Sequence, residues 1–432
     1  MTTTPPLCVG LSLAVTWLTG NGWRRPDSRV EDIFSSDFYI DIARRAEAAG
    51  VDFLFRPDSL FLDPGALSKS PGFSSLDPTL LLATLARETQ RIGLVTTAST
   101  SFYPPYIIAR QLQSLHWLSN GRAGWNIVTS MDGSGNFGSE PFPSSAQRYA
   151  QAAEFIDVVQ ALWSSYPAEA LVYDRGNGLY GHADRVRPIR HRSAHFTVEG
   201  PLNLPAFPGR RIPLFQAGAS HEGRDFAARV ADGVFAATPD MTAAIELRQD
   251  IRKRAARHGR DPDAVRVLPG LSLYLADSEA EARDMFAETH RGLGEARRYR
   301  VIADNLGLDV SSMPEGEKIT LEMLPDEDRN VRSRTHAALL RRLIARDAPT
   351  VGDLLSRPEV AGSAHWLFVG RPADAVREIE RWAHVGAIDG FIALPGGSDR
   401  SVALLLGELL PNLQLSGLFR SNLSGLSTEQ RV

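Results

Sequence analysis

The sequence of 432 residues predicts an α/β protein whose strands close into a (β/α)8 barrel. Short apolar runs alternate with longer amphipathic runs from one end of the chain to the other. Eight such pairs can be counted, and the chain is long enough for a barrel with insertions. A doubly wound open sheet shows the same alternation, but eight units favour the closed barrel.

Eight apolar runs are predicted as the barrel strands because each is short and bounded by turn residues. They are residues 7–16, 51–58, 91–100, 122–129, 212–220, 232–238, 265–276 and 387–395. A helix with an apolar face is predicted after each strand. These helices are residues 37–50, 77–89, 104–119, 146–164, 222–231, 242–258, 278–290 and about 399–410.

Two stretches interrupt the alternation. One follows the fourth strand and helix at about 165–211, and the other, at about 292–366, lies between the seventh and eighth units. Loops of this length in a compact domain usually form lids or binding elements. We therefore expect one barrel domain over residues 1–432 that carries two insertion segments.

The composition excludes several classes of protein. A net charge of −4 provides no footprint for nucleic acid or an anionic membrane, and no apolar run is long enough for a membrane span. The only cysteine, Cys8, lies in the first strand, where a buried hydrophobe is expected. Ten histidines show no metal-ligand spacing, so no metal site is expected. Without a signal-peptide pattern at the N-terminus, the protein is expected in the cytoplasm.

In a barrel, the active site forms where the strands end at their carboxyl side. Polar or small residues occupy these ends in the second to fifth strands. They are Asp58, Ser99, Thr100, Asn126, Ser130 and residues 218–220. Asn126 is the most informative of them, because an amide beside Trp125 in a core strand needs a polar partner.

Other residues leave two interpretations open. Asp58 could accept hydrogen bonds from a ligand, or it could pair with Arg56 or cap the next segment. Trp23 and Arg24 follow the first strand and could line a pocket, although Trp23 could equally pack beneath its loop. We include both, with Phe61 and Phe102, as candidate substrate contacts.

Two glycine motifs are candidates for phosphate binding. "GSGNFG" at 133–138 matches a dinucleotide fingerprint, but the prolines that follow it indicate a flexible loop instead. In "QAGASHEG" at 216–223, a strand ends in small residues and a helix begins directly, which is the arrangement of a phosphate cradle. Gly218 and Ser220 could also form only a tight turn and a helix cap.

Taken in order, several segments resemble the bacterial luciferase-like flavin monooxygenases, in the branch of the nitrilotriacetate and dibenzothiophene-sulfone monooxygenases. The resemblance covers nearly the whole chain. Its segments are "TGNGWRRPD", "VDFLFRPDSLF", "TTASTSFYPPYIIARQLQSLHWLSNGRAGWNIVTS", "RYAQAAEFIDVVQALW", "VRPIRHRSAHFTVEGPLNLP", "QAGASHEGRDFAARVADGVF" and "LLPNLQLSGLFR". Where the family often has a histidine before proline, this chain has Pro104.

The resemblance implies an FMN-dependent barrel enzyme. Reduced FMN would come from a separate NAD(P)H:flavin reductase, and one oxygen atom of O2 would pass to a small organic substrate. Asp58 and Thr100, with Ser99 and Ser130 beside them, would hold the flavin ring edge or ribityl chain. Asn126 would position the ring, which itself carries the chemistry. Tyr149, Gly218, Ala219 and Ser220 would hold the phosphate.

The family resemblance also implies a homodimer or homotetramer. The sequence is also compatible with two alternatives to the monooxygenase. One is a deazaflavin-dependent oxidoreductase of the same superfamily, which transfers hydride without O2. The other is a flavin-binding homologue without catalysis, which the departure at Pro104 keeps open.

Overall fold

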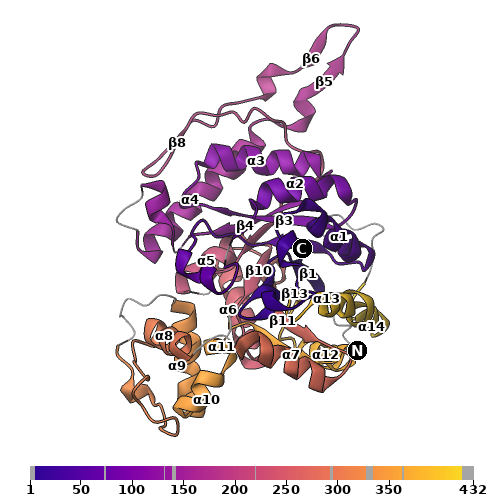
Figure 1. Ribbon diagram of the computed structural model, residues 1–432. Coiled ribbons are helices and arrows are strands. Elements are labelled where there is room, and N and C mark those ends of the chain that lie inside the picture. The colour runs from indigo at the N-terminus through magenta and orange to yellow at the C-terminus, as the bar shows by residue number, and fades with distance from the viewer. Residues whose placement is uncertain are drawn as a thin grey trace.

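Eight parallel strands close into a barrel, as predicted (Figure 1). The computed structural model describes residues 5–72, 74–130, 132–138, 143–218, 220–291, 295–326, 334–361 and 364–420. The strands follow one another around the barrel in the order β1, β2, β3, β4, β9, β10, β11, β13, and β13 pairs with β1. Their bounds are β1 Cys8–Ser12, β2 Phe53–Arg56, β3 Gly93–Ser99, β4 Ala123–Val128, β9 Leu214–Gln216, β10 Gly233–Ala236, β11 Arg266–Leu275 and β13 Gly390–Pro395.

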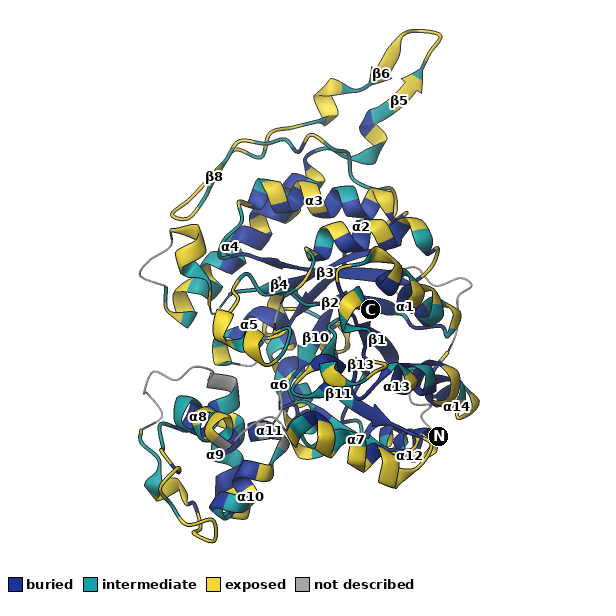
Figure 2. Cartoon of the chain, in the orientation of Figure 1, coloured by how far each residue is buried: buried dark blue, intermediate teal, exposed yellow. Residues whose placement is uncertain are grey.

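A helix follows each barrel strand and packs its apolar face on the barrel wall. These helices are α1 Ser36–Ala48, α2 Pro78–Glu88, α3 Pro105–Leu118, α4 Ser145–Ser164, α5 His221–Val230, α6 Met241–Arg257, α7 Glu279–Arg291 and α13 Asp399–Leu404. The last one continues through a π-helical turn, Leu405–Leu409, into α14 Leu410–Leu415. Figure 2 shows the resulting pattern, with buried strands inside and exposed outer helix faces. No helix within the described ranges is both long and apolar enough to cross a bilayer.

One strand and one helix lie outside the eight predicted units. Strand β12, Trp366–Gly370, pairs with residues 271–275 of β11, and α12, Pro372–His384, follows it. Strand β11 has ten residues, and β10 pairs only with its first four. Strand β12 therefore adds a ninth strand to the sheet along the carboxyl-terminal half of β11.

The two predicted insertions have different structures. Residues 165–211 contain two small hairpins, formed by β5 Leu171–Asp174 with β6 Leu179–Gly181 and by β7 His191–Arg192 with β8 Thr197–Val198. The β5–β6 hairpin projects well beyond the barrel (Figure 1). The second insertion contains α8 Glu295–Leu306, α9 Arg334–Asp347, α10 Val351–Ser356 and α11 Pro358–Ala361. Its helices pack around a hydrophobic cluster of their own that includes Ile302, Leu340 and Leu354.

Candidate active site

The barrel interior changes from apolar to polar toward the carboxyl ends of the strands. Phe53, Val95 and Phe215 belong to a buried apolar cluster that fills the barrel centre. Further along β3 and β4, the inward-facing residues are polar. They include Thr97 and Asn126, which alternate with outward-facing neighbours. The carboxyl end of the barrel is therefore the end that can accept a polar ligand.

Asn126 lies inside the barrel with one hydrogen-bonding atom unused. Its neighbours Trp125 and Ile127 pack outward against α3 and α4, so alternation directs Asn126 inward. The Nδ2 atom donates to Thr97 Oγ1 at 2.9 Å, while Oδ1 is buried without a hydrogen-bond partner among the described residues. Leaving such an acceptor unpaired costs about 1–3 kcal/mol, which is typical of a site that a ligand completes.

Hydroxyl groups line the adjoining ends of β3 and β4. The Oγ atoms of Ser99 and Ser130 lie 2.8 Å apart, and the Thr100 hydroxyl donates to the Val128 carbonyl at 3.2 Å. The structure thus brings these three predicted residues together beside Asn126. Each of the two paired serine hydroxyls retains further capacity to accept or donate a hydrogen bond.

Glycine is required where β9 leads into α5. A Cβ atom at Gly218 would overlap the hydroxyl of Tyr149, which reaches across from α4. The Gln216 side chain links the two elements, because Nε2 donates to the Tyr149 hydroxyl at 3.3 Å and Oε1 accepts from Gly218 N at 2.7 Å. Tyr149 is therefore held against the start of α5 through its contacts.

Ser220 forms the N-cap of α5, and its Oγ accepts from Gly223 N at 3.1 Å. The cap interpretation is thus correct, and the same hydroxyl can still donate to an anion. Glu222 places a carboxylate in the first turn of α5, which partly offsets the positive helix terminus. Ala219, the remaining predicted phosphate contact, lies outside the described residues.

Asp58 follows β2 at the same end of the barrel. Burial is the largest influence on its carboxyl group and raises its pKa, while a hydrogen bond from the Ser59 backbone acts in the opposite direction. No ion pair joins Asp58 to Arg56 within the described structure, because the Arg56 guanidinium bonds the Leu13 carbonyl and stacks over Tyr39. Asp58 thus keeps acceptor capacity for a ligand.

The four candidate substrate contacts lie in loops of differing accessibility. Trp23 donates to the Lys69 carbonyl at 2.7 Å and so packs against the loop that follows β2, while Arg24 is exposed. The neighbouring Arg25 anchors this segment, because it bonds Met285 O at 2.7 Å and Thr289 Oγ1 at 2.6 Å. Phe61 is exposed, and Phe102 stacks on Phe137 with 4.4 Å between ring centroids.

Sequence reasoning overlooked several residues that shape this region. Thr97 precedes Ser99 by two positions, so strand alternation alone could have placed it inside the barrel. Gln216 closes β9 with a polar side chain, which was a similar signal. Phe137 belongs to the short 3-10 helix Ser134–Phe137, and its stacking on Phe102 could not be anticipated from spacing.

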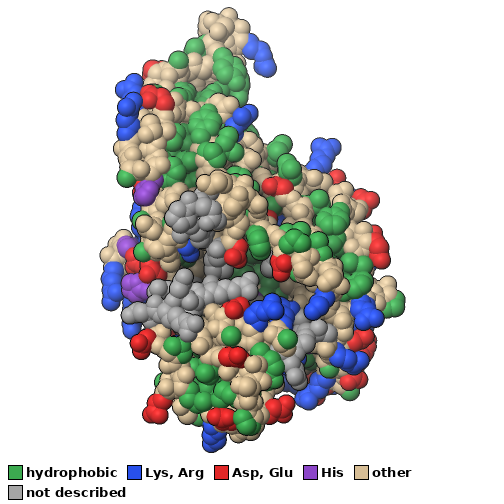
Figure 3. All heavy atoms as spheres, turned by 60° about the vertical axis from the view of Figure 1, so that its left-hand side comes forward, with side chains coloured by type: hydrophobic (Ala, Val, Ile, Leu, Met, Phe, Trp, Pro, Cys, Tyr) green, Lys and Arg blue, Asp and Glu red, His purple; other side chains and the backbone are tan. Residues whose placement is uncertain are grey.

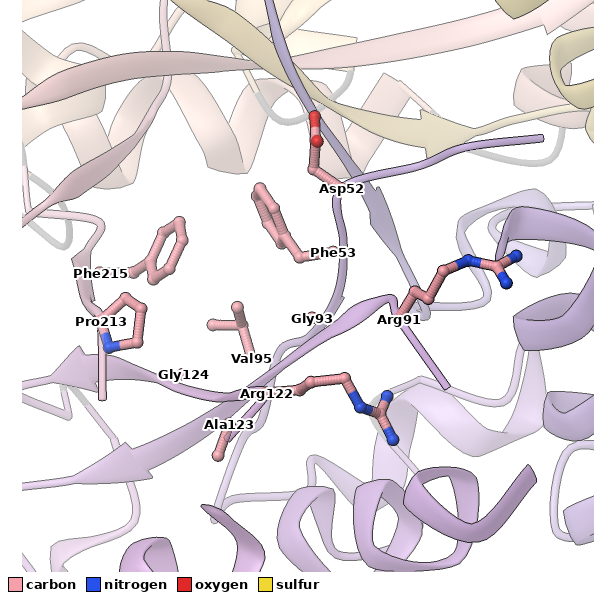
Figure 4. A pocket seen from close by; sticks show the side chains of 10 residues that line it. All are labelled: Asp52, Phe53, Arg91, Gly93, Val95, Arg122, Ala123, Gly124, Pro213 and Phe215. Atoms are coloured by element: carbon pink, nitrogen blue, oxygen red, sulfur yellow. The ribbon is translucent and has the colours of Figure 1, made fainter. Parts of the chain in front are cut away.

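A separate pocket lies at the opposite end of the barrel, among the residues where the strands begin (Figure 4). Asp52, Gly93 and Ala123 line it at the starts of β2, β3 and β4. Arg91 and Arg122 also border it, but their guanidinium groups point away from its centre (Figure 4). This pocket is remote from the polar strand ends, where barrel enzymes carry their active sites.

The chain is similar to known proteins over most of its length. The family model described as luciferase-like monooxygenase matches residues 17–387. The chain is 33% identical to the N-acetyl-S-(2-succino)cysteine monooxygenase of Bacillus subtilis strain 168, over 98% of this chain and 95% of the relative. It is 34% identical to nitrilotriacetate monooxygenase component A of Aminobacter aminovorans, over 96% of this chain and 94% of the relative.

A solved structure is similar over almost the same length. It is a riboflavin lyase crystallised with modified FMN and riboflavin, with a TM-score of 0.85 and 28% identity. The alignment covers 99% of this chain and 95% of the lyase.

Proposed function

Because this chain belongs to the luciferase-like monooxygenase family and is a flavin-dependent monooxygenase, we propose that it uses reduced FMN and O2 to oxygenate a small organic molecule. A separate NAD(P)H:flavin reductase would supply the reduced FMN. The relative named "component A" supports this two-component arrangement, and the lyase structure with modified FMN supports the choice of flavin. The proposal includes a homodimer or homotetramer in the cytoplasm.

The observation that carries the FMN proposal is the Oδ1 of Asn126, which is buried and has no hydrogen-bond partner in the described part of the chain. A flavin ring is flat and largely apolar, yet its pyrimidine edge carries an imide N–H between two carbonyl groups. The buried amide oxygen of Asn126 is an acceptor suited to that N–H. The buried apolar cluster inside the barrel, which includes Phe55 of β2, suits the apolar body of the ring.

The start of α5 is proposed to hold the FMN phosphate. Gly218 allows the Tyr149 hydroxyl to approach the backbone, and the hydroxyls of Tyr149 and Ser220 can both donate to phosphate oxygens. Backbone N–H groups at a helix start favour an anion there, and the preceding residue Ala219 is proposed to contribute as well. Asp58, Ser99, Thr100 and Ser130 are proposed to bond the ring edge and ribityl chain between these two points.

When bound, reduced flavin would be the group that reacts with O2. The role of the protein is then to position the reactants and to exclude water. Asn126 would fix the ring plane, and burial around Asp58 would hold its hydrogen bonds in a weakly screened environment. Loop residues Trp23, Arg24, Phe61 and Phe102 are proposed to face the organic substrate.

The decisive test is an assay that supplies reduced FMN and O2 to the purified protein. A panel of sulfones, aminopolycarboxylates, alkanes and heterocycles should include at least one compound that is oxygenated. Product analysis with ¹⁸O2 should show one labelled oxygen atom in that product. Hydride transfer from reduced deazaflavin, without O2 uptake, would instead support the alternative oxidoreductase.

Replacement of Asn126 tests the ring position directly. We expect Asn126→Leu to weaken FMN binding about tenfold, the loss of roughly one buried hydrogen bond, as measured by quenching of FMN fluorescence. Asn305→Leu is the matched control, because Asn305 also has a buried, unpaired Oδ1 but lies on α8 in the second insertion. Equal FMN affinities in the Asn126→Leu variant and the unmodified protein would contradict the assignment.

A further inference from the structure

A tyrosine of β11 covers part of the carboxyl end of the barrel. Tyr274 is the last inward-facing residue of β11, because Leu273 and Leu275 pack outward between the barrel wall and the helices. A Cβ atom at Gly396, just past the end of β13, would overlap the Tyr274 ring, so this ring lies beside both strand ends. Strand β13 is four strands from β4 in either direction around the barrel. Tyr274 therefore approaches the barrel mouth from the side opposite Asn126.

Two hydrogen-bonding atoms at this position are unused. The Tyr274 ring meets Phe286 of α7 edge to face at 5.0 Å and lies 5.7 Å from the ring of His290. The Nδ1 atom of His290 donates to the Phe286 carbonyl at 2.8 Å, so Nε2 is the acceptor of the neutral ring. Neither this Nε2 atom nor the Tyr274 hydroxyl has a hydrogen-bond partner among the residues with described positions. One acceptor and one donor are thus available side by side.

Arg298 adds a positive charge that has no carboxylate partner in the described ranges. It is partly buried near the start of α8, and its Nε atom is buried without a hydrogen bond to any described residue. Removal of a guanidinium from water is unfavourable unless an anion or several acceptors take the place of the water. This arrangement of Arg298 is therefore typical of a site that binds an anion.

The electrostatic surroundings of His290 place Arg298 near the same end of the barrel. Burial is the largest influence on the pKa of His290 and lowers it, and the charges of Arg298, Arg297 and Arg25 lower it further. Glu288 offsets part of this charge, because it lies 3.6 Å from Arg25. Basic side chains also gather beside the hollow in the middle of the face shown in Figure 3. The potential around the His290 ring is consequently positive.

We propose that Arg298 and Tyr274 bind a carboxylate group of the organic substrate, and that His290 accepts a hydrogen bond from a hydroxyl or N–H group next to that carboxylate. The two oxygen atoms of a carboxylate can accept from the guanidinium and from the phenol at once. The substrate class is then a carboxylic acid with a neighbouring hydrogen-bond donor. This inference rests on the proposed function, for which it names the substrate class.

The position of this subsite is compatible with the proposed flavin position. Tyr274 and Asn126 lie on opposite sides of the barrel mouth, so a substrate held by its carboxylate can extend toward a ring held by Asn126. The start of α5, proposed for the phosphate, follows β9, which is two strands from β11. The two anion sites are therefore separate.

The test is calorimetric titration of the purified full chain with mandelate, which carries a carboxylate beside a hydroxyl group. We expect methyl mandelate, which has no charge, to bind at least about tenfold more weakly than mandelate. α-Methoxyphenylacetate, which keeps the carboxylate but cannot donate to His290, should bind about fivefold more weakly.

Variants should locate this binding. Arg298→Met should weaken mandelate binding about 10- to 100-fold, the loss expected for a charged hydrogen bond, and leave the affinity for methyl mandelate unchanged. Tyr274→Phe keeps the packed ring and should weaken mandelate binding about fivefold. Arg300→Met is the matched control, because Arg300 lies on the same helix but is exposed, so its mandelate affinity should be normal.

Unchanged circular dichroism in the variants would show that the fold is intact. Equal affinities for mandelate and its methyl ester, normal mandelate binding in Arg298→Met and Tyr274→Phe, or no binding of mandelate at millimolar concentration would overturn the proposal. Because the titration needs no flavin, it is independent of the oxygenation assay. Mandelate binding by a protein that oxygenates nothing with reduced FMN would contradict the proposed function and leave the subsite standing. Oxygenation confined to uncharged compounds would overturn the subsite alone.

Discussion

The two ends of the barrel differ in whether their buried polar groups have hydrogen-bond partners. At the amino end, aspartates placed just before three strands accept backbone N–H groups from neighbouring strands. These bonds join Asp52 to Val9 N, Asp232 to Leu214 N, and Asp389 to Val267 N. At the carboxyl end, Asn126 keeps an acceptor with no partner among the described residues, and burial raises the pKa of Asp58.

Arg122 shows the same contrast most strongly. This buried side chain at the amino end donates to the Ser119, Ile92, Ala86 and Thr89 carbonyls and to the Thr89 hydroxyl, at 2.7–3.0 Å. Burial lowers its pKa, and the carbonyl groups replace the water it has lost. One end of the barrel therefore holds the fold together, while the other leaves polar groups available for a ligand.

The largest expected effect on stability would come from replacing Arg122, whose hydrogen bonds join several segments at the amino end of the barrel. Arg122→Met should lower the free energy of unfolding by roughly 3–5 kcal/mol, because it leaves several buried carbonyl groups without a hydrogen-bond donor. Denaturant unfolding would measure this loss. Arg91→Met is the control, since Arg91 borders the same pocket but is exposed, and it should change stability by less than about 0.5 kcal/mol. Equal losses of stability in Arg122→Met and Arg91→Met would show that the hydrogen bonds of Arg122 do not stabilise the amino end in this way.

The next largest effect on stability is expected from lowering the pH, through a buried histidine near the amino end of the barrel. His116 is buried on α3, and burial lowers its pKa from 6.5 to about 4. Between these values the unfolded chain takes up a proton that the folded chain does not. The contribution of His116 to stability should therefore be largest above pH 6.5 and fall by up to about 3 kcal/mol as the pH approaches 4.

Unfolding curves at several pH values would test this expectation. His116→Gln should flatten the part of the pH dependence between 6.5 and 4, whatever its effect on absolute stability. His384→Gln should leave that slope unchanged, because His384 is exposed at the end of α12. An unaltered slope in His116→Gln would show that other groups cause the acid sensitivity.

The smallest effect on folding, and the largest on binding, is expected at the carboxyl end. A methyl group at Gly218 would overlap the Tyr149 hydroxyl, so Gly218→Ala should disturb the proposed phosphate cradle. We expect FMN affinity to fall about 10- to 100-fold, equivalent to roughly 1.4–2.7 kcal/mol, with a smaller loss of stability.

Fluorescence titration with FMN would measure the change. Gly135→Ala is the matched control, because its added Cβ, in the short 3-10 helix Ser134–Phe137, would have none of the described residues beyond its chain neighbours within 4 Å. Normal FMN affinity in Gly218→Ala, or equal losses of FMN affinity in both variants, would show that the start of α5 does not bind the FMN phosphate.

The fold could be predicted because its signals are local. All eight barrel strands and the helix after each were predicted within a few residues, since turn residues bound them and each helix has an apolar face. Strand β12 and helix α12 were overlooked because eight units already completed a barrel. Trp366–Gly370 has the composition of a strand, and only its pairing with β11 shows that it extends the sheet.

By itself, the sequence determined the barrel, the end of it at which a site is expected, and the anomaly of Asn126 in a core strand. Only the tertiary structure decided which atom of Asn126 is unpaired, that Tyr149 requires glycine at 218, and that Arg25 rather than Arg24 anchors its loop. It also decided that residues 171–181 project as an arm. The division has a physical cause: periodicity and turns depend on neighbours in the chain, whereas these contacts join residues far apart in sequence.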